Sequence, residues 1–181
     1  MAKAPNSKQH WDRSYSIGLA VAALMAGLVP AFADDDPLLA RFVGDWIGRG
    51  TYRAGASSDP EQIYCKITNR LADNGAVLEQ KGRCAIPSES GLVKGRISAQ
   101  GAGRYDGSLQ SISTKGPATL AGVGSNGTLT FTADFIDRLT NRPGKSTLKL
   151  VAGTDNYRLT SSEVGAKSAT YLSTDIVFTH N

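Results

Sequence analysis

The sequence contains few of the residues that most often perform catalysis or bind metals. It has only two histidines and two cysteines in 181 residues, and His180 is one residue from the C-terminus. A Ser-His-Asp or Cys-His arrangement needs an imidazole held firmly beside its nucleophile. Zinc sites normally need several His or Cys ligands. We therefore expect a protein that is not an enzyme and that needs neither a cofactor nor a metal.

The short motifs of common enzymes are also missing. The chain has no G-x-S-x-G, H-E-x-x-H, C-x-x-C or phosphate-loop pattern. The carboxylates Asp134 and Asp137 lie beside the charged segment 138–145, which we interpret as a solvated loop rather than an acid–base pair. The segment 137–145 could instead contact an acidic surface such as lipopolysaccharide or an envelope protein partner. No basic stripe indicates a nucleic-acid partner.

Long apolar runs are limited to one segment, 17–29, which carries no charge. It is short for a membrane helix, which needs about 20 residues. Basic residues precede it and the small-x-small triplet 31–33 follows it, a pattern typical of a signal peptide over 1–33, cleaved after Ala33. An uncleaved N-terminal anchor is the alternative. We expect a mature domain, 34–181, that is periplasmic or secreted and has no transmembrane span.

The two cysteines, Cys65 and Cys84, lie at equal distances from Asn74-Gly75. Asn-Gly favours the two-residue type I′ loop of a β-hairpin, which would place the cysteines opposite each other. Ideal alternation makes them a hydrogen-bonded pair with Cα atoms about 5.5 Å apart. Export to an oxidising compartment then predicts a disulfide, which contributes about 3 kcal/mol. A redox-active pair is the weaker alternative, because the spacing is not C-x-x-C.

Almost every segment after residue 43 has the pattern of a strand or a turn, and no amphipathic helix exceeds two turns. A short helical turn is predicted over 36–42, with Asp36 as N-cap and Pro37 in the first turn. Consecutive hairpins predict an all-β fold, a single antiparallel up-and-down β-barrel of about 8–10 strands whose closure removes exposed edges. The predicted strands are 44–52, 61–71, 76–86, 92–100, 104–113, 118–125, 128–136, 146–152, 157–164 and 169–179.

Two amides, Asn69 and Gln80, oppose each other on the apolar face of the first hairpin. Buried amides need hydrogen-bond partners. They either bond to each other or line a cavity and orient a ligand. The same register places Arg70 opposite Glu79, a favourable cross-strand pair.

The segment 42–50, with Gly44 and Trp46 after a short helical turn, resembles the start of calycin-type barrels: lipocalins, fatty-acid-binding proteins and nitrobindin-like proteins. The resemblance implies a lipocalin-like barrel over 34–181 in which Trp46 plugs one end. The chain is also similar to small exported proteins of Gram-negative bacteria. One feature departs from lipocalins, whose last strands carry an Arg that packs on the Trp. The final strand here has none, and Arg158 is the nearest.

The resemblance favours a non-enzymatic barrel that binds a small apolar or amphipathic ligand in its interior. The candidate ligand-binding residues are Trp46, Asn69, Gln80, Phe131, Phe135 and Phe178. The alternative is a periplasmic protein-binding module, such as an enzyme inhibitor, with a packed interior and binding loops. Nitrobindin-like barrels hold haem through a His near the C-terminus, so His180 is either a haem ligand or a frayed terminal residue.

Overall fold

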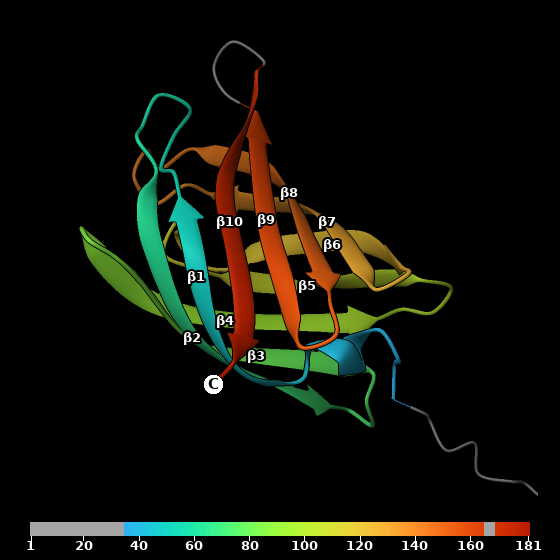
Figure 1. The fold of residues 1–181 in the computed structure, drawn as a ribbon. Helices are drawn as coiled ribbons and strands as arrows, with labels where there is room; N and C mark the ends of the chain where they lie inside the picture. Colours follow the sequence, from blue (N-terminus) through green and yellow to red (C-terminus); the bar gives the residue numbers. More distant parts are fainter. Residues whose placement is uncertain (1–34, 165–168) are drawn as a thin grey trace, which may run out of the picture. The chain divides into compact units, whose positions relative to one another are not determined.

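The computed structural model describes residues 35–164 and 169–181, and it is a closed antiparallel β-barrel of ten strands (Figure 1). Each strand pairs with its neighbours in the sequence, and the first strand closes the barrel against the last. The strands are β1 (Gly44–Tyr52), β2 (Glu61–Ala72), β3 (Val77–Ile86), β4 (Glu89–Ala99), β5 (Arg104–Gln110), β6 (Ala118–Ser125), β7 (Thr128–Ile136), β8 (Pro143–Ala152), β9 (Asn156–Val164) and β10 (Thr170–His180).

The predicted fold class is confirmed, and the boundaries of β1, β6 and β7 match the prediction. The predicted fifth strand is too long, because β5 ends at Gln110. There the Ser111 N–H donates to the Thr114 hydroxyl at 3.0 Å, so side-chain bonding forms a turn in place of a strand. The predicted signal peptide, 1–33, lies outside the described residues.

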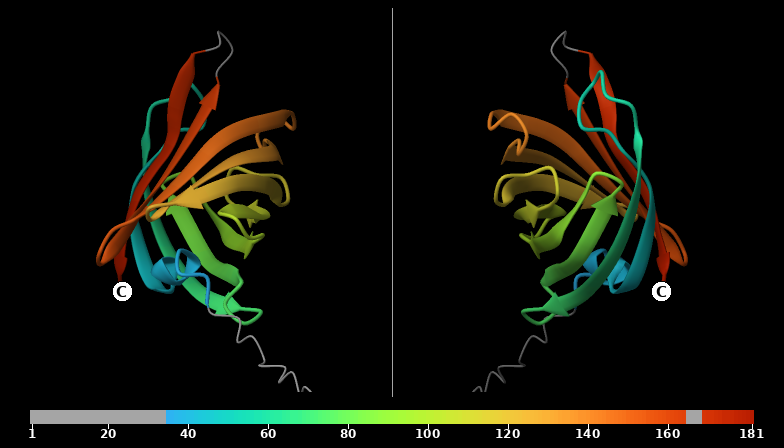
Figure 2. Two further views of the ribbon diagram at one scale, coloured as in Figure 1. Left: turned by 90° about the vertical axis from the view of Figure 1, so that its right-hand side faces the viewer. Right: turned by 90° about the vertical axis from the view of Figure 1, so that its left-hand side faces the viewer.

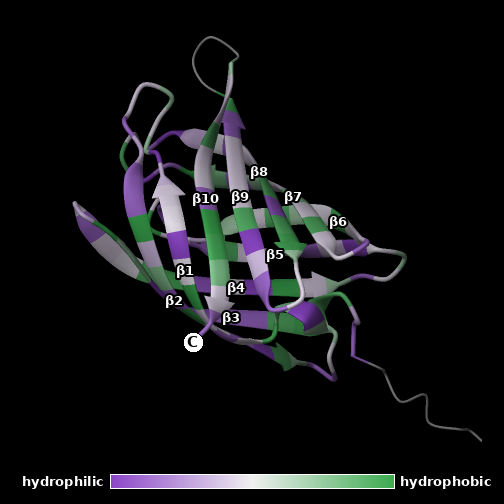
Figure 3. Ribbon diagram, viewed as in Figure 1, coloured by the Kyte–Doolittle hydropathy of each residue, from purple (hydrophilic) through white to green (hydrophobic). Residues whose placement is uncertain are grey.

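Alternation along the strands separates an apolar interior from a polar exterior. The hydropathy colouring in Figure 3 changes at successive positions along most strands, as expected for side chains that point alternately inward and outward. Along β7, for example, Leu129, Phe131 and Ala133 are buried, whereas Thr132 and Asp134 are exposed. Gly122 and Gly124 lie opposite Phe131 and Leu129, as the sequence predicted.

One end of the barrel, hereafter the closed end, is covered by the 3-10 turn η1 (Leu39–Phe42). Both views in Figure 2 show this blue turn at the end of the barrel where the C-terminus lies. The turn is a 3-10 helix that begins at Leu39, not the predicted helical turn over 36–42. The N-cap of the turn is Leu38 and not the predicted Asp36, but the Asp36 carboxylate accepts hydrogen bonds from the N–H groups of Leu38 and Leu39.

Contacts to β5 and to the β8–β9 connection hold this turn in place. The Tyr105 hydroxyl donates to the Asp36 carboxylate at 3.1 Å, and burial together with this bond raises the pKa of Tyr105 to about 12. The Arg41 guanidinium donates to the carbonyls of Ala152 and Gly153. The closed end is therefore fixed to β5 and to the β8–β9 connection.

The β2–β3 hairpin has the predicted register, with Cys65 opposite Cys84 and a disulfide between them. Their Cα atoms are 4.1 Å apart, so the predicted hydrogen-bonded spacing of about 5.5 Å is wrong. Asp73 has a positive φ like Asn74 and Gly75. With three residues in the left-handed region, the connection is not an ideal two-residue loop. Such a loop would have fixed which opposed residues of β2 and β3 form hydrogen-bonded pairs, and here it does not.

The expected ion pair between Arg70 and Glu79 is not formed, although the two residues are opposite each other. Arg70 instead pairs with Asp45 on β1 at 2.8 Å. Glu79 pairs with Arg96 on β4 at 3.1 Å. Each side chain therefore finds its partner on the strand at its other side.

Candidate functional site

Aromatic side chains fill the closed end. Trp46 is 3% exposed, and its Nε1–H donates to the Phe42 carbonyl at 2.9 Å. Tyr157 contacts Trp46 edge-on at 5.0 Å between ring centroids and stacks on Phe178 at 4.4 Å. The imidazole of His180 also stacks on Trp46, with the ring centroids 4.0 Å apart. Trp46 is thus buried at the closed end, where the sequence predicted a plug, and the His180 imidazole stacks on it.

A chain of amide hydrogen bonds runs beside this plug. The Asn69 amide donates to the Phe42 carbonyl at 2.9 Å, and Gln80 donates to Asn69 Oδ1 at 3.2 Å. The predicted bond between the two amides is confirmed. The Tyr157 hydroxyl is buried close to Asn69, yet no hydrogen bond of ordinary geometry joins them. Among buried side-chain polar atoms of the described residues, this hydroxyl alone has no partner.

Above this end lies an interior cavity of about 130 Å³. Aliphatic and aromatic side chains from most of the strands make up the larger part of its wall. The disulfide contributes to the same wall. The apolar lining includes Ile63, Ile67, Leu78, Ile97, Leu109, Phe135, Leu148, Leu150, Leu159, Ile176 and Phe178. Such a lining can hold an apolar molecule or the apolar part of an amphipathic one.

Hydroxyl groups gather toward the opposite end, hereafter the open end, where β1 and β9 finish and β2 and β10 begin. Eight serines and threonines line the cavity. Four lie on β8 to β10 (Ser146, Ser161, Ser173 and Thr174), three lie in the segment after β5 (Ser111, Ser113 and Thr114), and Ser108 lies on β5.

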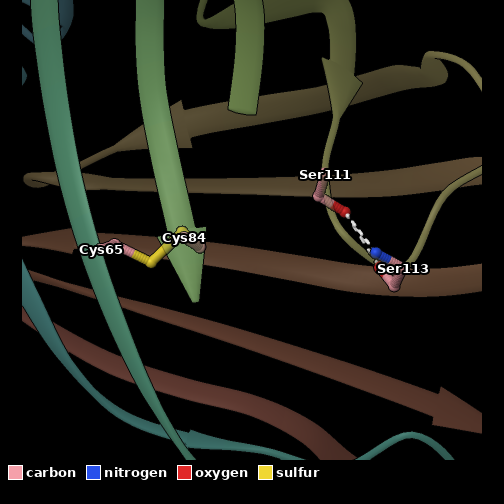
Figure 4. The surroundings of a disulfide bond; sticks show 4 residues. All are labelled: Cys65, Cys84, Ser111 and Ser113. Atoms are coloured by element: carbon pink, nitrogen blue, oxygen red, sulfur yellow. Dashed lines mark hydrogen bonds between the residues drawn. A yellow bond between two sulfur atoms is a disulfide. The ribbon is translucent and has the colours of Figure 1, made fainter. Parts of the chain in front are cut away.

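Some of these hydroxyls bond to each other and some face the cavity. Figure 4 shows Ser111 and Ser113 turned toward each other, and their hydroxyl oxygens are 2.9 Å apart. The Ser173 hydroxyl donates to the Ser161 carbonyl at 3.1 Å. Ser146 and Ser161 are buried side chains on the inward face of β8 and β9. Their hydroxyls are therefore placed to hydrogen-bond a molecule in the cavity.

One carboxylate lies among these hydroxyls. Glu163 lines the cavity at the end of β9 and accepts a hydrogen bond from the Tyr171 hydroxyl at 2.9 Å. Burial and then this bond raise the pKa of Tyr171 above its usual range. Burial, followed by the negative charge of Glu163, also raises the pKa of Tyr52. Both phenols are consequently neutral near pH 7.

The structure separates the six predicted ligand residues into two groups. Gln80, Phe135 and Phe178 line the cavity. Trp46, Asn69 and Phe131 lie in the core outside that lining. Whether any of the six contacts a ligand stays a prediction.

The sequence-based reasoning missed the hydroxyl groups and Glu163. Their signal was present, because Ser161 and Glu163 share the inward parity of Tyr157 and Leu159 on one strand. Polar residues at inward positions of a barrel strand indicate a lined cavity rather than a packed core.

In the part of the chain that the structure describes, the residues expected of a metal or haem site do not come together. Among residues 35–164 and 169–181, no three His, Cys, Asp or Glu side chains gather closely enough to hold a metal ion. His180 is exposed beside Trp46 at the closed end and does not line the cavity. No helix within those residues is long and apolar enough to cross a membrane.

The fold and the cavity define the class of protein as a closed ten-strand up-and-down β-barrel with a mainly apolar interior. No protein-family model and no curated protein sequence matches the chain.

Proposed function

We propose that this protein is an exported, calycin-like barrel that binds a small apolar or amphipathic ligand in its interior and has no catalytic role. The observation that carries the proposal is the cavity, whose wall is apolar over most of its length and bears hydroxyls toward the open end. A molecule with an apolar body and a polar head matches this arrangement, with its body against the apolar wall and its head beside the hydroxyls. A protein-binding module would need exposed loops but no interior space.

The disulfide supports the proposed export, because such bonds persist in oxidising compartments. The periplasm is the compartment that we propose. The redox alternative is disfavoured because both cysteines are buried, whereas reactive cysteines are usually accessible.

The test is uptake of the neutral fluorescent probe N-phenyl-1-naphthylamine by the purified protein. We expect saturable binding to the wild type and a large loss in Leu159→Trp, which fills the cavity from β9. Val151→Trp is the matched control, because Val151 on β8 is 38% exposed on the outer surface. Circular dichroism checks that both variants fold.

Native mass spectrometry of protein purified from its own periplasm complements this test by looking for a co-purified small molecule. Absence of probe binding to folded wild type, or equal binding by both tryptophan variants, would refute an interior site. A stoichiometric protein partner instead of a small molecule would favour the inhibitor-like alternative.

A further inference from the structure

The lining of the cavity is asymmetric in charge. Of the described residues that form it, Glu163 is the only Asp or Glu, and no Lys, Arg or His is among them. We propose that the ligand is a cationic amphiphile, an amine with an apolar tail, whose ammonium group pairs with Glu163. This inference rests on the proposed function, because it specifies the ligand of the same cavity.

The position of Glu163 suits it to bind a headgroup. It lies opposite Ser146 on β8 and Tyr171 on β10 in the ladder. A carboxylate has about four acceptor sites, of which the Tyr171 hydroxyl uses one. Ser161 lies two residues earlier on the same inward face. An ammonium group donates three hydrogen bonds, so Glu163 and the neighbouring hydroxyl oxygens can together accept all of them.

The charges that act on Tyr52, a residue of the cavity lining, favour the same sign of ligand. The pKa of Tyr52 is raised first by burial and then by Glu163, Asp137 and Glu61, with Arg138 opposing. The guanidinium of Arg138 is paired with Glu89, and neither residue lines the cavity. The potential at Tyr52 is therefore dominated by carboxylates, which attract a cation toward the cavity.

An anionic headgroup fits poorly for the same reason. A buried carboxylate needs a positive partner or several donors, because desolvation of an unpaired charge is very costly. The hydroxyls could donate, but Glu163 would repel the second negative charge. A neutral hydroxyl headgroup meets no repulsion and gains no ion pair. The expected order of affinity is therefore amine, then alcohol, then carboxylate.

The experiment is competition against N-phenyl-1-naphthylamine at pH 7.5 with decylamine and decanoate, each below its micelle concentration, and with decanol below its solubility limit. The shared ten-carbon chain leaves only the headgroup to differ. We expect decylamine to displace the probe at roughly tenfold lower concentration than decanol, since bonds to charged groups are the stronger ones. Decanoate should be the weakest competitor.

Two variants test whether Glu163 causes the preference for decylamine over decanol. Glu163→Gln removes the charge and should make decylamine and decanol equal competitors, each compared against the probe affinity measured for that variant. Glu61→Gln is the matched control, because Glu61 lies at the start of β2 and accepts a bond from Ser88 without lining the cavity. It should keep the wild-type order.

The outcomes separate the two proposals. If decanoate competes as well as decanol, or if decylamine shows no advantage, the cationic headgroup is refuted while interior binding stands. If the preference for decylamine persists in Glu163→Gln, Glu163 is not its source and the inference fails. If the wild type does not bind the probe at all, the proposed function itself fails. If Glu163→Gln does not fold, the order of the three competitors on wild type still decides the headgroup.

Discussion

The two ends of this barrel use polar groups in opposite ways. At the closed end the Trp46 indole and the Asn69 amide are both bonded to the Phe42 carbonyl, and the Tyr157 ring contacts the rings of Phe42 and Trp46. At the open end, hydroxyls and Glu163 face a cavity. The polar groups of the closed end therefore stabilise the fold. Those of the open end face the cavity, where the proposed ligand could form hydrogen bonds with them.

The largest expected effect comes from emptying the closed end. Trp46→Ala should lower the free energy of unfolding by about 3–5 kcal/mol, because it opens a large void and leaves the Phe42 carbonyl with one donor fewer. Urea denaturation followed by circular dichroism measures it. Phe135→Ala is the comparison at the open end, where the ring already borders the cavity, and it should cost clearly less. Equal losses would remove the distinction between the ends.

The disulfide provides the next effect, because it joins β2 and β3 and also lines the cavity. Reduction, or the double change Cys65→Ala with Cys84→Ala, should lower stability by about 3 kcal/mol, since the unfolded chain regains the freedom of the closed loop. Denaturation with and without dithiothreitol measures this. The double variant should be insensitive to the reductant; a reductant effect that persists there would point to another cause.

A smaller loss is expected at the buried amide. Asn69→Leu should destabilise by about 1–3 kcal/mol, because the Phe42 carbonyl loses a donor and Gln80 loses its acceptor. Ser161→Ala is the open-end counterpart and should change stability little, because its hydroxyl faces the cavity. Thermal unfolding of the two variants compares the ends directly. A larger loss from Ser161→Ala would contradict the assignment of structural polar groups to the closed end.

The exception at the closed end is the Tyr157 hydroxyl, which is buried without a partner. Tyr157→Phe should therefore leave stability within about 1 kcal/mol of wild type or raise it, because the lost group makes no hydrogen bond. Its ring contacts with Trp46 and Phe178 would be retained. A clear destabilisation in urea would show that the hydroxyl has a partner in solution.

The smallest effect should appear at low pH, away from both ends. Arg158 lowers the pKa of Asp175 by hydrogen bonding and by its charge. A folded-state pKa below the unfolded value stabilises the fold above that unfolded value, near 3.9, and the benefit is lost as pH falls through the folded pKa. The free energy of unfolding of Asp175→Asn should therefore be lower than that of wild type near pH 7, and the difference should shrink below about pH 4. Denaturation midpoints between pH 2 and pH 7 measure it; a constant gap would contradict the linkage.

The sequence predicted the barrel well because its signals are local. Alternation, turn residues and the Asn74-Gly75 symmetry gave the strand order, the register and the disulfide, all of which depend on neighbours along one or two strands. The hydrogen-bonding phase was wrong because Asp73 adopts an additional left-handed conformation. Ion pairing was wrong because each strand has a second neighbour, which the hairpin alone does not reveal.

The sequence alone predicted an antiparallel up-and-down barrel with a disulfide-linked hairpin and an indole near one end, and the structure showed that the barrel is closed. Three further features became visible only in the folded barrel: His180 stacks on Trp46, Asn69 bonds to Phe42, and Ser146, Ser161 and Glu163 share one cavity. The physical reason is closure. The tilt and stagger of strands in a closed barrel decide which inward residues reach the same level, and those residues come from strands far apart in the chain.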